Sequence, residues 1–298
     1  MQKPKVIVIL GETATGKSDL AVKIALRLRS GQAQGGEVIS ADSRQVYKNL
    51  DIGTGKITKR EMLGVPHHLL DVANPKKVFT VAEYKKLAET KIKEIIARGK
   101  IPIICGGTGF YIDAITKGIV FPEVPPNLKL RKTLEKKPTQ ELFKILKQLD
   151  KTRAKNIDAK NKVRLVRAIE IAKTLGKVPA IAQTVPEYEF IKIGLFLPEK
   201  LLKEKISKRL LSRIKKGMLT EVKKLHKAGL SWKRMEELGL EYRFMALYLQ
   251  NKITKQKMVE KLNSEIYRYA KRQMTWFKRD KEIKWFDASK KIDYNKFI

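Results

Sequence analysis

The stretch KVIVILGETATGKSDLAVKIALRL, residues 5–28, decides the fold of this chain of 298 residues. It begins with a short apolar run, KVIVIL, and ends in a segment whose apolar residues recur at helical spacing. Between them, GETATGKS at 11–18 fits the pattern G-x-x-x-x-G-K-[ST]. In that pattern, successive backbone N–H groups and a helix N-terminus hold phosphate groups. A strand before the loop and a helix after it are the required context, so we predict a phosphate-binding loop.

Two residues of this loop carry specific chemistry. Lys17 supplies a positive charge, and the Ser18 hydroxyl is placed to bind Mg²⁺. The predicted phosphate-binding residues are Gly11, Glu12, Thr13, Ala14, Thr15, Gly16, Lys17 and Ser18.

Strands and helices alternate after the loop. EVISAD at 37–42 and IPIIC at 101–105 are expected strands, and a helix is expected over 81–99. This alternation predicts an α/β fold: a P-loop-containing parallel sheet with helices on both faces. Ligands of such sheets bind beyond the carboxyl ends of the strands. The loop, Asp42–Ser43 and the turn 106–108 should therefore converge on one site.

The composition and the predicted elements of the chain change after about residue 120. A Pro-rich break, FPEVPPN at 121–127, precedes Lys/Arg-rich segments with helical patterns up to about residue 176. IKIGLFLP at 191–198 is an expected strand, 200–280 is strongly helical, and KWF at 284–286 is an expected last strand. We predict a first part of the core over 1–119, a helical insertion over 120–189, and a mostly helical and basic second part of the core over 190–298.

Positive charge is concentrated in the later part. The formal net charge is +34, and residues 121–298 carry 45 Lys and Arg against 20 Asp and Glu. Such a field attracts polyanions, most commonly nucleic acid, although a lysine-rich surface can also serve solubility alone. The apolar runs are far shorter than the roughly 20 residues of a membrane span. With Cys105 as the single cysteine, no intrachain disulfide forms, which suits a cytoplasmic location. We also expect a monomer without membrane contact.

Asp42 allows two interpretations from its position alone. An acid at the end of a neighbouring strand can help to hold Mg²⁺ in a phosphoryl-transfer site. The same place suits a general base.

Five motifs in order resemble those of the tRNA dimethylallyltransferases of the bacterial type. Besides the loop they are ISADSRQVYKNLDIGTGK (39–56), PHHLLD (66–71), GGTGFYIDAI (106–115) and YAKRQMTWFKRD (269–280). The resemblance implies a prenyltransferase that moves a dimethylallyl group from dimethylallyl diphosphate to N6 of the adenine at tRNA position 37, next to the anticodon, and releases diphosphate. Mg²⁺ is the implied cofactor. The alternatives are a P-loop nucleotide or nucleoside kinase and a non-catalytic RNA-binding protein.

The resemblance also implies residue roles. Thr13, Lys17 and Arg209 would neutralise the leaving diphosphate together with Mg²⁺ at Ser18, and Asp42 would accept the proton of the adenine amine. The amine is reachable only if the base leaves its stack. The resemblance also implies that the helical insertion over 120–189 binds tRNA. The implied tRNA contacts are Asp42, Ser43, Arg44, Gln45, Thr108, Arg131, Val163, Arg164, Leu165, Val166, Arg167 and Arg243.

Further expectations concern individual side chains. We expect Val163, Val166, Ile169, Ala172 and Leu175 to face a core, leaving Arg164 and Arg167 on one outer face. Glu12 stands where the family usually has proline, and an acid here should point away from the phosphates. His67 and His68 are expected to be hydrogen-bonded structural residues, and Cys105 a small buried hydrophobic residue.

Overall fold

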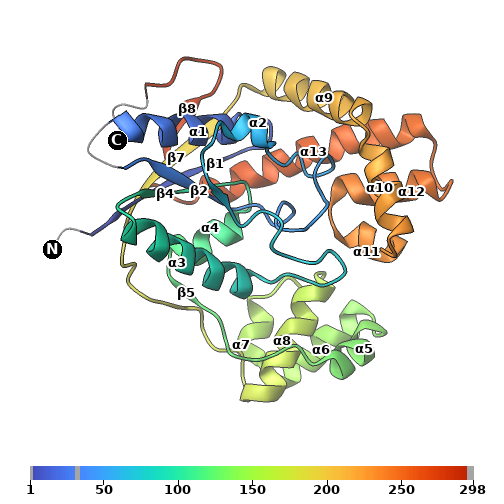
Figure 1. Cartoon of the computed structure of the whole chain (residues 1–298). Coiled ribbons are helices and arrows are strands. Elements are labelled where there is room, and N and C mark those ends of the chain that lie inside the picture. Colours follow the sequence, from blue (N-terminus) through green and yellow to red (C-terminus); the bar gives the residue numbers. More distant parts are fainter. Residues whose placement is uncertain (1–2, 31–33, 294–298) are drawn as a thin grey trace. The chain divides into compact units, whose positions relative to one another are not determined.

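The computed structural model describes residues 3–30 and 34–293 (Figure 1). The chain divides into two compact units. The first combines Met1–Lys117 with Pro186–Ile298, and the second is Gly118–Val185. The second unit begins and ends a few residues before the insertion expected at 120–189.

A six-stranded parallel sheet forms the centre of the first unit, in the order β3-β2-β4-β1-β7-β8. Its strands are β1 Lys5–Gly11, β2 Gly36–Ser40, β3 His67–His68, β4 Ile101–Cys105, β7 Glu189–Phe196 and β8 Lys284–Asp287. In the register, Ile7 lies opposite Ile103 on one side and Ile191 on the other. Because β1 is buried on both faces, it is a continuous apolar run without polar alternation.

Helices cover both faces of this sheet, as the sequence predicts (Figure 1). Alternate residues of β1 enter different clusters: Val8 packs with α3 (Val81–Ala97), α4 (Gly109–Thr116) and α13 (Lys255–Phe277), whereas Ile9 packs with α1 (Lys17–Arg27). The α3 helix begins with a capping box in which Thr80 and Glu83 satisfy each other's backbone N–H groups.

The remaining helices of the first unit are short or lie near its C-terminal part. They are η1 Leu28–Ser30, α2 Lys59–Met62, α9 Glu199–Lys215, α10 Met218–Lys227, α11 Trp232–Glu237 and α12 Leu240–Leu249. Apolar residues of α9, α10, α11 and α12 join the same cluster as α3 and α13. The basic helical region therefore has an apolar core continuous with one face of the sheet.

The second unit is helical with a small strand pair. Its elements are β5 Ile119–Val120, α5 Leu128–Glu135, α6 Thr139–Leu149, α7 Lys151–Lys155, α8 Lys162–Leu175 and β6 Ala182–Gln183. Leu142, Leu146, Leu165 and Ile169 are fully buried in its own core. The α8 helix ends at Gly176, whose φ of 79° favours glycine.

The prediction of which α8 residues face the core was wrong in part. Val163 is 79% exposed and Leu175 48% exposed, whereas Leu165 is buried. An uninterrupted i+3 series turns by about −60° at each step, so it cannot stay on one face of a helix with 3.6 residues per turn. The side chains of Leu165 and Val166, which the family resemblance implies as tRNA contacts, lie in the core of this unit.

No helix within the described ranges is both long and apolar enough to span a bilayer. The strands expected around residues 37–42, 101–105, 191–198 and 284–286 are all present: β4 matches its expected range, and the ends of the other three differ by at most two residues. The two-residue strand β3 and helix α2 lie in segments for which the sequence predicts no element.

Candidate active site

The glycine loop connects β1 to α1 at the carboxyl edge of the sheet. Gly11 has a φ of 135°, and a Cβ there would lie 2.1 Å from the carbonyl oxygen of Leu195, so no other residue fits. Gly16 adopts a left-handed conformation just before α1 begins at Lys17. Thr15 Oγ1 donates to the backbone oxygen of Glu12 at 2.8 Å, and Lys17 Nζ donates to the same oxygen. The loop is therefore held in a compact form by its own side chains.

Gln273 on α13 forms hydrogen bonds to the glycine loop and to a neighbouring turn. Its Oε1 accepts from the backbone N–H of Thr13 at 2.9 Å, and its Nε2 donates to the carbonyl oxygen of Gly107 at 2.9 Å. The side chain thus joins the loop after β1 to the turn after β4. Sequence analysis did not single out Gln273, although it lies within the motif at 269–280.

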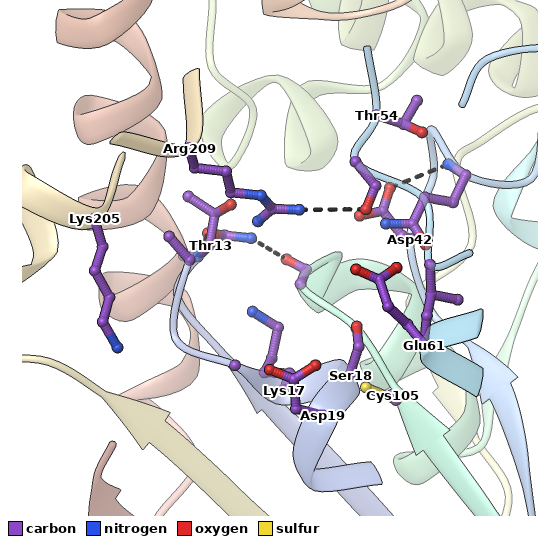
Figure 2. Close-up of a pocket in the computed structure, with 18 of the residues that line it drawn as sticks. Thr13, Lys17, Ser18, Asp19, Asp42, Thr54, Glu61, Cys105, Lys205 and Arg209 are labelled. Atoms are coloured by element: carbon purple, nitrogen blue, oxygen red, sulfur yellow. Dashed lines mark hydrogen bonds between the residues drawn. The ribbon is translucent and has the colours of Figure 1, made fainter. Parts of the chain in front are cut away.

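The three segments predicted to converge border one cavity of about 450 Å³. Figure 2 shows Lys17, Ser18, Asp42 and Arg209 around it. The loop, Asp42 and the turn at Gly106–Gly107 contribute to its lining, which confirms the predicted convergence. Its lining also includes residues that sequence analysis missed: Asp19, Thr54, Gly55, Ile57, Glu61, Lys205, Lys208, Tyr269 and Gln273.

Several positively charged side chains line this cavity. Burial, together with the Arg209 guanidinium, lowers the pKa of Lys17 to about 8 against the opposing effect of nearby acidic groups. The pKa of Arg209 is itself lowered, first by burial and then by Arg213. Burial raises the pKa of Cys105 to about 12, so this buried thiol stays neutral. A bound anion would relieve the repulsion between Lys17 and Arg209.

Asp42 lies half-buried at the end of β2. Its Oδ1 accepts from the backbone N–H groups of Arg44 at 2.8 Å and Gln45 at 3.3 Å. Thr108, which precedes α4, accepts through Oγ1 from the Ser43 backbone N–H at 3.0 Å and donates to Ser43 Oγ at 3.3 Å. The predicted residues Asp42, Ser43 and Thr108 are therefore joined in one local arrangement.

Glu12 is only 5% exposed and does not line the cavity. Burial raises its pKa, while a hydrogen bond from the Leu197 backbone opposes that rise. Lys17 and Lys278 attract the carboxylate as well, which also lowers its pKa. The loop thus accommodates an acid by directing its side chain away from the phosphate site.

The arginines predicted to contact tRNA have different surroundings. Arg131 and Arg167 both bind Glu170, which is only 1% exposed, at 2.7 Å and 2.5 Å. Arg164 is exposed, so it does not share the environment of Arg167. On α12, the exposed Arg243 donates from Nε to the carbonyl oxygen of Glu236 at 3.1 Å.

The histidine pair has partners that fit a structural role. His68 Nε2 lies 2.7 Å from Glu37 Oε2, and His67 Nδ1 lies 2.8 Å from the Val65 carbonyl oxygen. Within residues 3–30 and 34–293, no group of three or more His, Cys, Asp and Glu side chains is arranged to hold a metal ion by itself.

Comparison with known proteins decides the family. The family described as IPP transferase matches residues 45–280. The chain belongs to the IPP transferase family. A tRNA dimethylallyltransferase 2 of Treponema denticola is 44% identical over 278 residues, covering 92% of this chain and 91% of the relative. A tRNA dimethylallyltransferase of Caldanaerobacter subterraneus is 42% identical over 293 residues, covering 95% and 91%.

Solved structures agree with the IPP transferase assignment. The full-length tRNA isopentenylpyrophosphate transferase of Bacillus halodurans superposes with a TM-score of 0.72 at 36% identity, covering 99% of this chain and 93% of that one. A eukaryotic dimethylallyltransferase acting on tRNA has a TM-score of 0.79 at 25% identity, with 96% and 74% covered.

Proposed function

We propose that this chain transfers a dimethylallyl group from dimethylallyl diphosphate to N6 of the adenine at tRNA position 37 and releases diphosphate. Membership of the family makes the chain a tRNA dimethylallyltransferase, an enzyme that modifies a tRNA adenine. The identity of the donor, the modified atom and the residue roles are our inference. The family assignment also sets aside the kinase and the non-catalytic RNA-binding protein.

The observation that carries the proposal is the cationic cavity at the glycine loop. Lys17 and Arg209 face a shared space next to backbone N–H groups at the start of α1. A diphosphate ester would neutralise both side chains, and Thr13 lines the same space. As the bond from carbon to oxygen breaks, negative charge grows on the diphosphate, so fixed cations stabilise the transition state more than the ground state.

Asp42 would accept the proton that leaves the attacking amine. Its Oδ1 is occupied by two backbone N–H groups, whereas no described residue donates to Oδ2. The bound oxygen fixes the carboxylate, and the other is free for the amine. Ser43, Gln45 and Thr108 adjoin the same position and would border the flipped adenine.

Ser18 fits a Mg²⁺ ion bound together with the donor. The exposed hydroxyl lies in the cavity with Asp19 and Asp42, and Mg²⁺ commonly takes few protein ligands beside phosphate oxygens and water. Bound there, the ion would neutralise charge on the departing diphosphate.

The tRNA would meet the basic surface of both units. Residues 121–298 carry most of the net charge, and Arg164, Arg243 and Arg44 are exposed. We propose the helical unit, with Arg131, Arg164 and Arg167, as part of this surface. Val163 is exposed beside them and is available for an apolar contact. We further propose that the chain acts as a monomer, and tRNA as substrate supports a cytoplasmic location.

The test is prenylation of purified, unmodified tRNA with Mg²⁺ and dimethylallyl diphosphate, followed by mass spectrometry of the nucleosides. We expect prenylated adenosine without ATP, and modest inhibition when ATP is added in excess. A tRNA with guanine in place of the target adenine is the matched control. A strict ATP requirement, or inorganic phosphate released in step with product, would overturn the proposal.

A further inference from the structure

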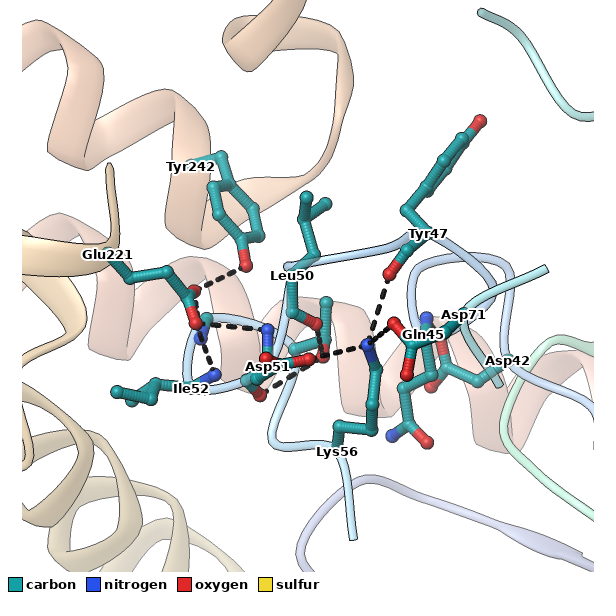
Figure 3. Close-up of polar contacts among 12 residues, drawn as sticks. Asp42, Gln45, Tyr47, Leu50, Asp51, Ile52, Lys56, Asp71, Glu221 and Tyr242 are labelled. Atoms are coloured by element: carbon teal, nitrogen blue, oxygen red, sulfur yellow. Dashed lines mark hydrogen bonds and ion pairs between the residues drawn. The ribbon is translucent and has the colours of Figure 1, made fainter. Parts of the chain in front are cut away.

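The sequence DIGTGK forms a loop over Asp51–Lys56 that borders the cavity through Thr54 and Gly55. The proposed mechanism assigns no role to this loop. Its backbone is nevertheless held by two charged side chains, Glu221 on α10 (Figure 3) and Arg213 on α9.

Glu221 on α10 binds three successive backbone N–H groups of the loop. Its Oε2 accepts from Asp51 at 3.0 Å and Ile52 at 2.7 Å, and its Oε1 accepts from Gly53 at 2.8 Å. The Tyr242 hydroxyl donates to Oε1 at 2.7 Å. Hydrogen bonds to a carboxylate are stronger than neutral ones, so this single side chain fixes one half of the loop.

Arg213 on α9 binds the carbonyl groups of the same residues. Its Nε donates to the Ile52 oxygen at 2.6 Å, and its Nη2 donates to the Gly53 oxygen. Its Nη1 lies 3.2 Å from Glu241 Oε1. Arg213 is therefore fully engaged by the loop and by a carboxylate.

Close packing explains the two glycines of the loop. A Cβ on Gly53 would lie 2.4 Å from the Tyr242 ring, and a Cβ on Gly55 would lie 2.3 Å from Arg209 Nη2. Gly55 also has a φ of 63°, which favours glycine. The loop thus lies directly against Arg209.

Lys56 ties the other end of the loop to the segment after Asp42. Its Nζ donates to Asp51 and Asp71 at 2.6 Å each and to the Tyr47 carbonyl oxygen at 3.0 Å. The loop is consequently anchored on both sides.

Arg209 lies one helical turn from Arg213 but has fewer protein partners for its guanidinium group. Its Nη2 donates to the Gly55 carbonyl oxygen at 3.2 Å, and no carboxylate among the described residues forms an ion pair with it. Gly55 is therefore the protein contact that aims this guanidinium, and the remaining N–H groups are available to the cavity.

We infer that Glu221 is a positioning residue of this enzyme: by fixing the Asp51–Lys56 loop, it holds the Gly55 carbonyl where that oxygen directs Arg209 onto the donor diphosphate. This inference rests on the proposed function, since it assumes that the cavity binds a diphosphate. Glutamine at 221 has one acceptor oxygen in place of two and presents N–H groups to backbone N–H groups, so the loop would shift and Arg209 with it.

The test is a double-mutant cycle on the affinity for inorganic pyrophosphate, measured by calorimetry with the full chain and Mg²⁺. Arg209→Ala should weaken binding about 10- to 100-fold, the loss of charge-assisted hydrogen bonds. Glu221→Gln should weaken it roughly tenfold, and the double variant should bind like Arg209→Ala alone. The control Glu260→Gln, which removes an exposed carboxylate on α13 whose hydrogen bond is to Gln256 of the same helix, should leave affinity unchanged.

Kinetics add a second readout. Glu221→Gln should raise KM for the donor and lower kcat while leaving tRNA affinity unchanged, whereas a loss of folded protein would lower the apparent kcat alone. Additive effects in the cycle, or wild-type affinity in Glu221→Gln, would overturn the inference while the proposed function stands. A wild-type chain that binds no pyrophosphate would overturn both.

If Glu221→Gln does not fold, Tyr242→Phe takes its place in the cycle. That variant keeps the ring against Gly53 and removes one hydrogen bond to Glu221. We expect about 2- to 10-fold weaker pyrophosphate binding, which disappears when Arg209 is alanine. Unchanged affinity in Tyr242→Phe would count against the inference.

Discussion

The lowered pKa of Lys17 makes donor binding depend on pH. Burial and Arg209 bring this pKa to about 8 in the empty cavity. The protonated fraction therefore falls from roughly 90% at pH 7 to roughly 10% at pH 9. A bound diphosphate favours charged Lys17, so binding takes up a proton wherever the amine is neutral. We expect affinity for dimethylallyl diphosphate to fall about tenfold between pH 7 and pH 9.

The stability of the empty protein should respond in the opposite direction. The folded pKa of Lys17, about 8, lies below its unfolded value of about 10.4. Between these values the unfolded chain binds more protons, so the contribution of Lys17 to stability rises with pH across that window. Ligand affinity and unliganded stability thus carry opposite signs for the same group.

Calorimetry of donor binding from pH 7 to pH 9 measures the effect. The donor is fully ionised there, because the last ionisation of a phosphate ester has a pKa near 6. At pH 8, buffers of different ionisation enthalpy should reveal uptake of about half a proton. Lys17→Arg remains charged throughout and should give a flat profile. The same slope in Lys17→Arg as in the wild type, or no proton uptake at pH 8, would refute the reasoning.

Three other predictions follow from the site and the helical unit. Asp42→Asn should lower the single-turnover rate about 10²- to 10⁴-fold with tRNA and donor affinities intact; a near-normal rate would remove the base role. Gln273→Leu leaves two backbone groups without their partner and should lower the free energy of unfolding by about 1–3 kcal/mol in urea titrations, whereas an unchanged midpoint would show that water replaces the amide. Arg167→Ala should flatten the slope of log tRNA affinity against log salt by about one unit; an unchanged slope would show that Arg167 serves Glu170 alone.

The sheet and the loop could be predicted because their signals are local. The run KVIVIL, the loop glycines and the apolar spacing of 19–28 lie within 24 consecutive residues, and each element follows from its own pattern. The parallel order then brings Asp42 and Gly107 to the loop, since strand ends meet at one edge.

The side chains that hold the loops of the site in place could not be predicted in this way. Gln273 and Glu221 are single polar residues on amphipathic helices, and the backbone groups that they bind lie more than 160 residues away. Nothing in their own neighbourhood distinguishes them from solvated residues. The position of Glu170 inside α8 was also hidden, because a buried acid interrupts the apolar pattern that periodicity detects.

The hydrogen bond between Gln273 and the Thr13 backbone has a consequence for synthesis of the chain. These two residues are 260 positions apart, so the phosphate loop emerges from the ribosome early and is completed only when α13 arrives. A nascent or truncated chain that ends before α13 has β1, α1 and the glycine loop in sequence but lacks the amide that holds Thr13. Such a fragment should bind pyrophosphate poorly.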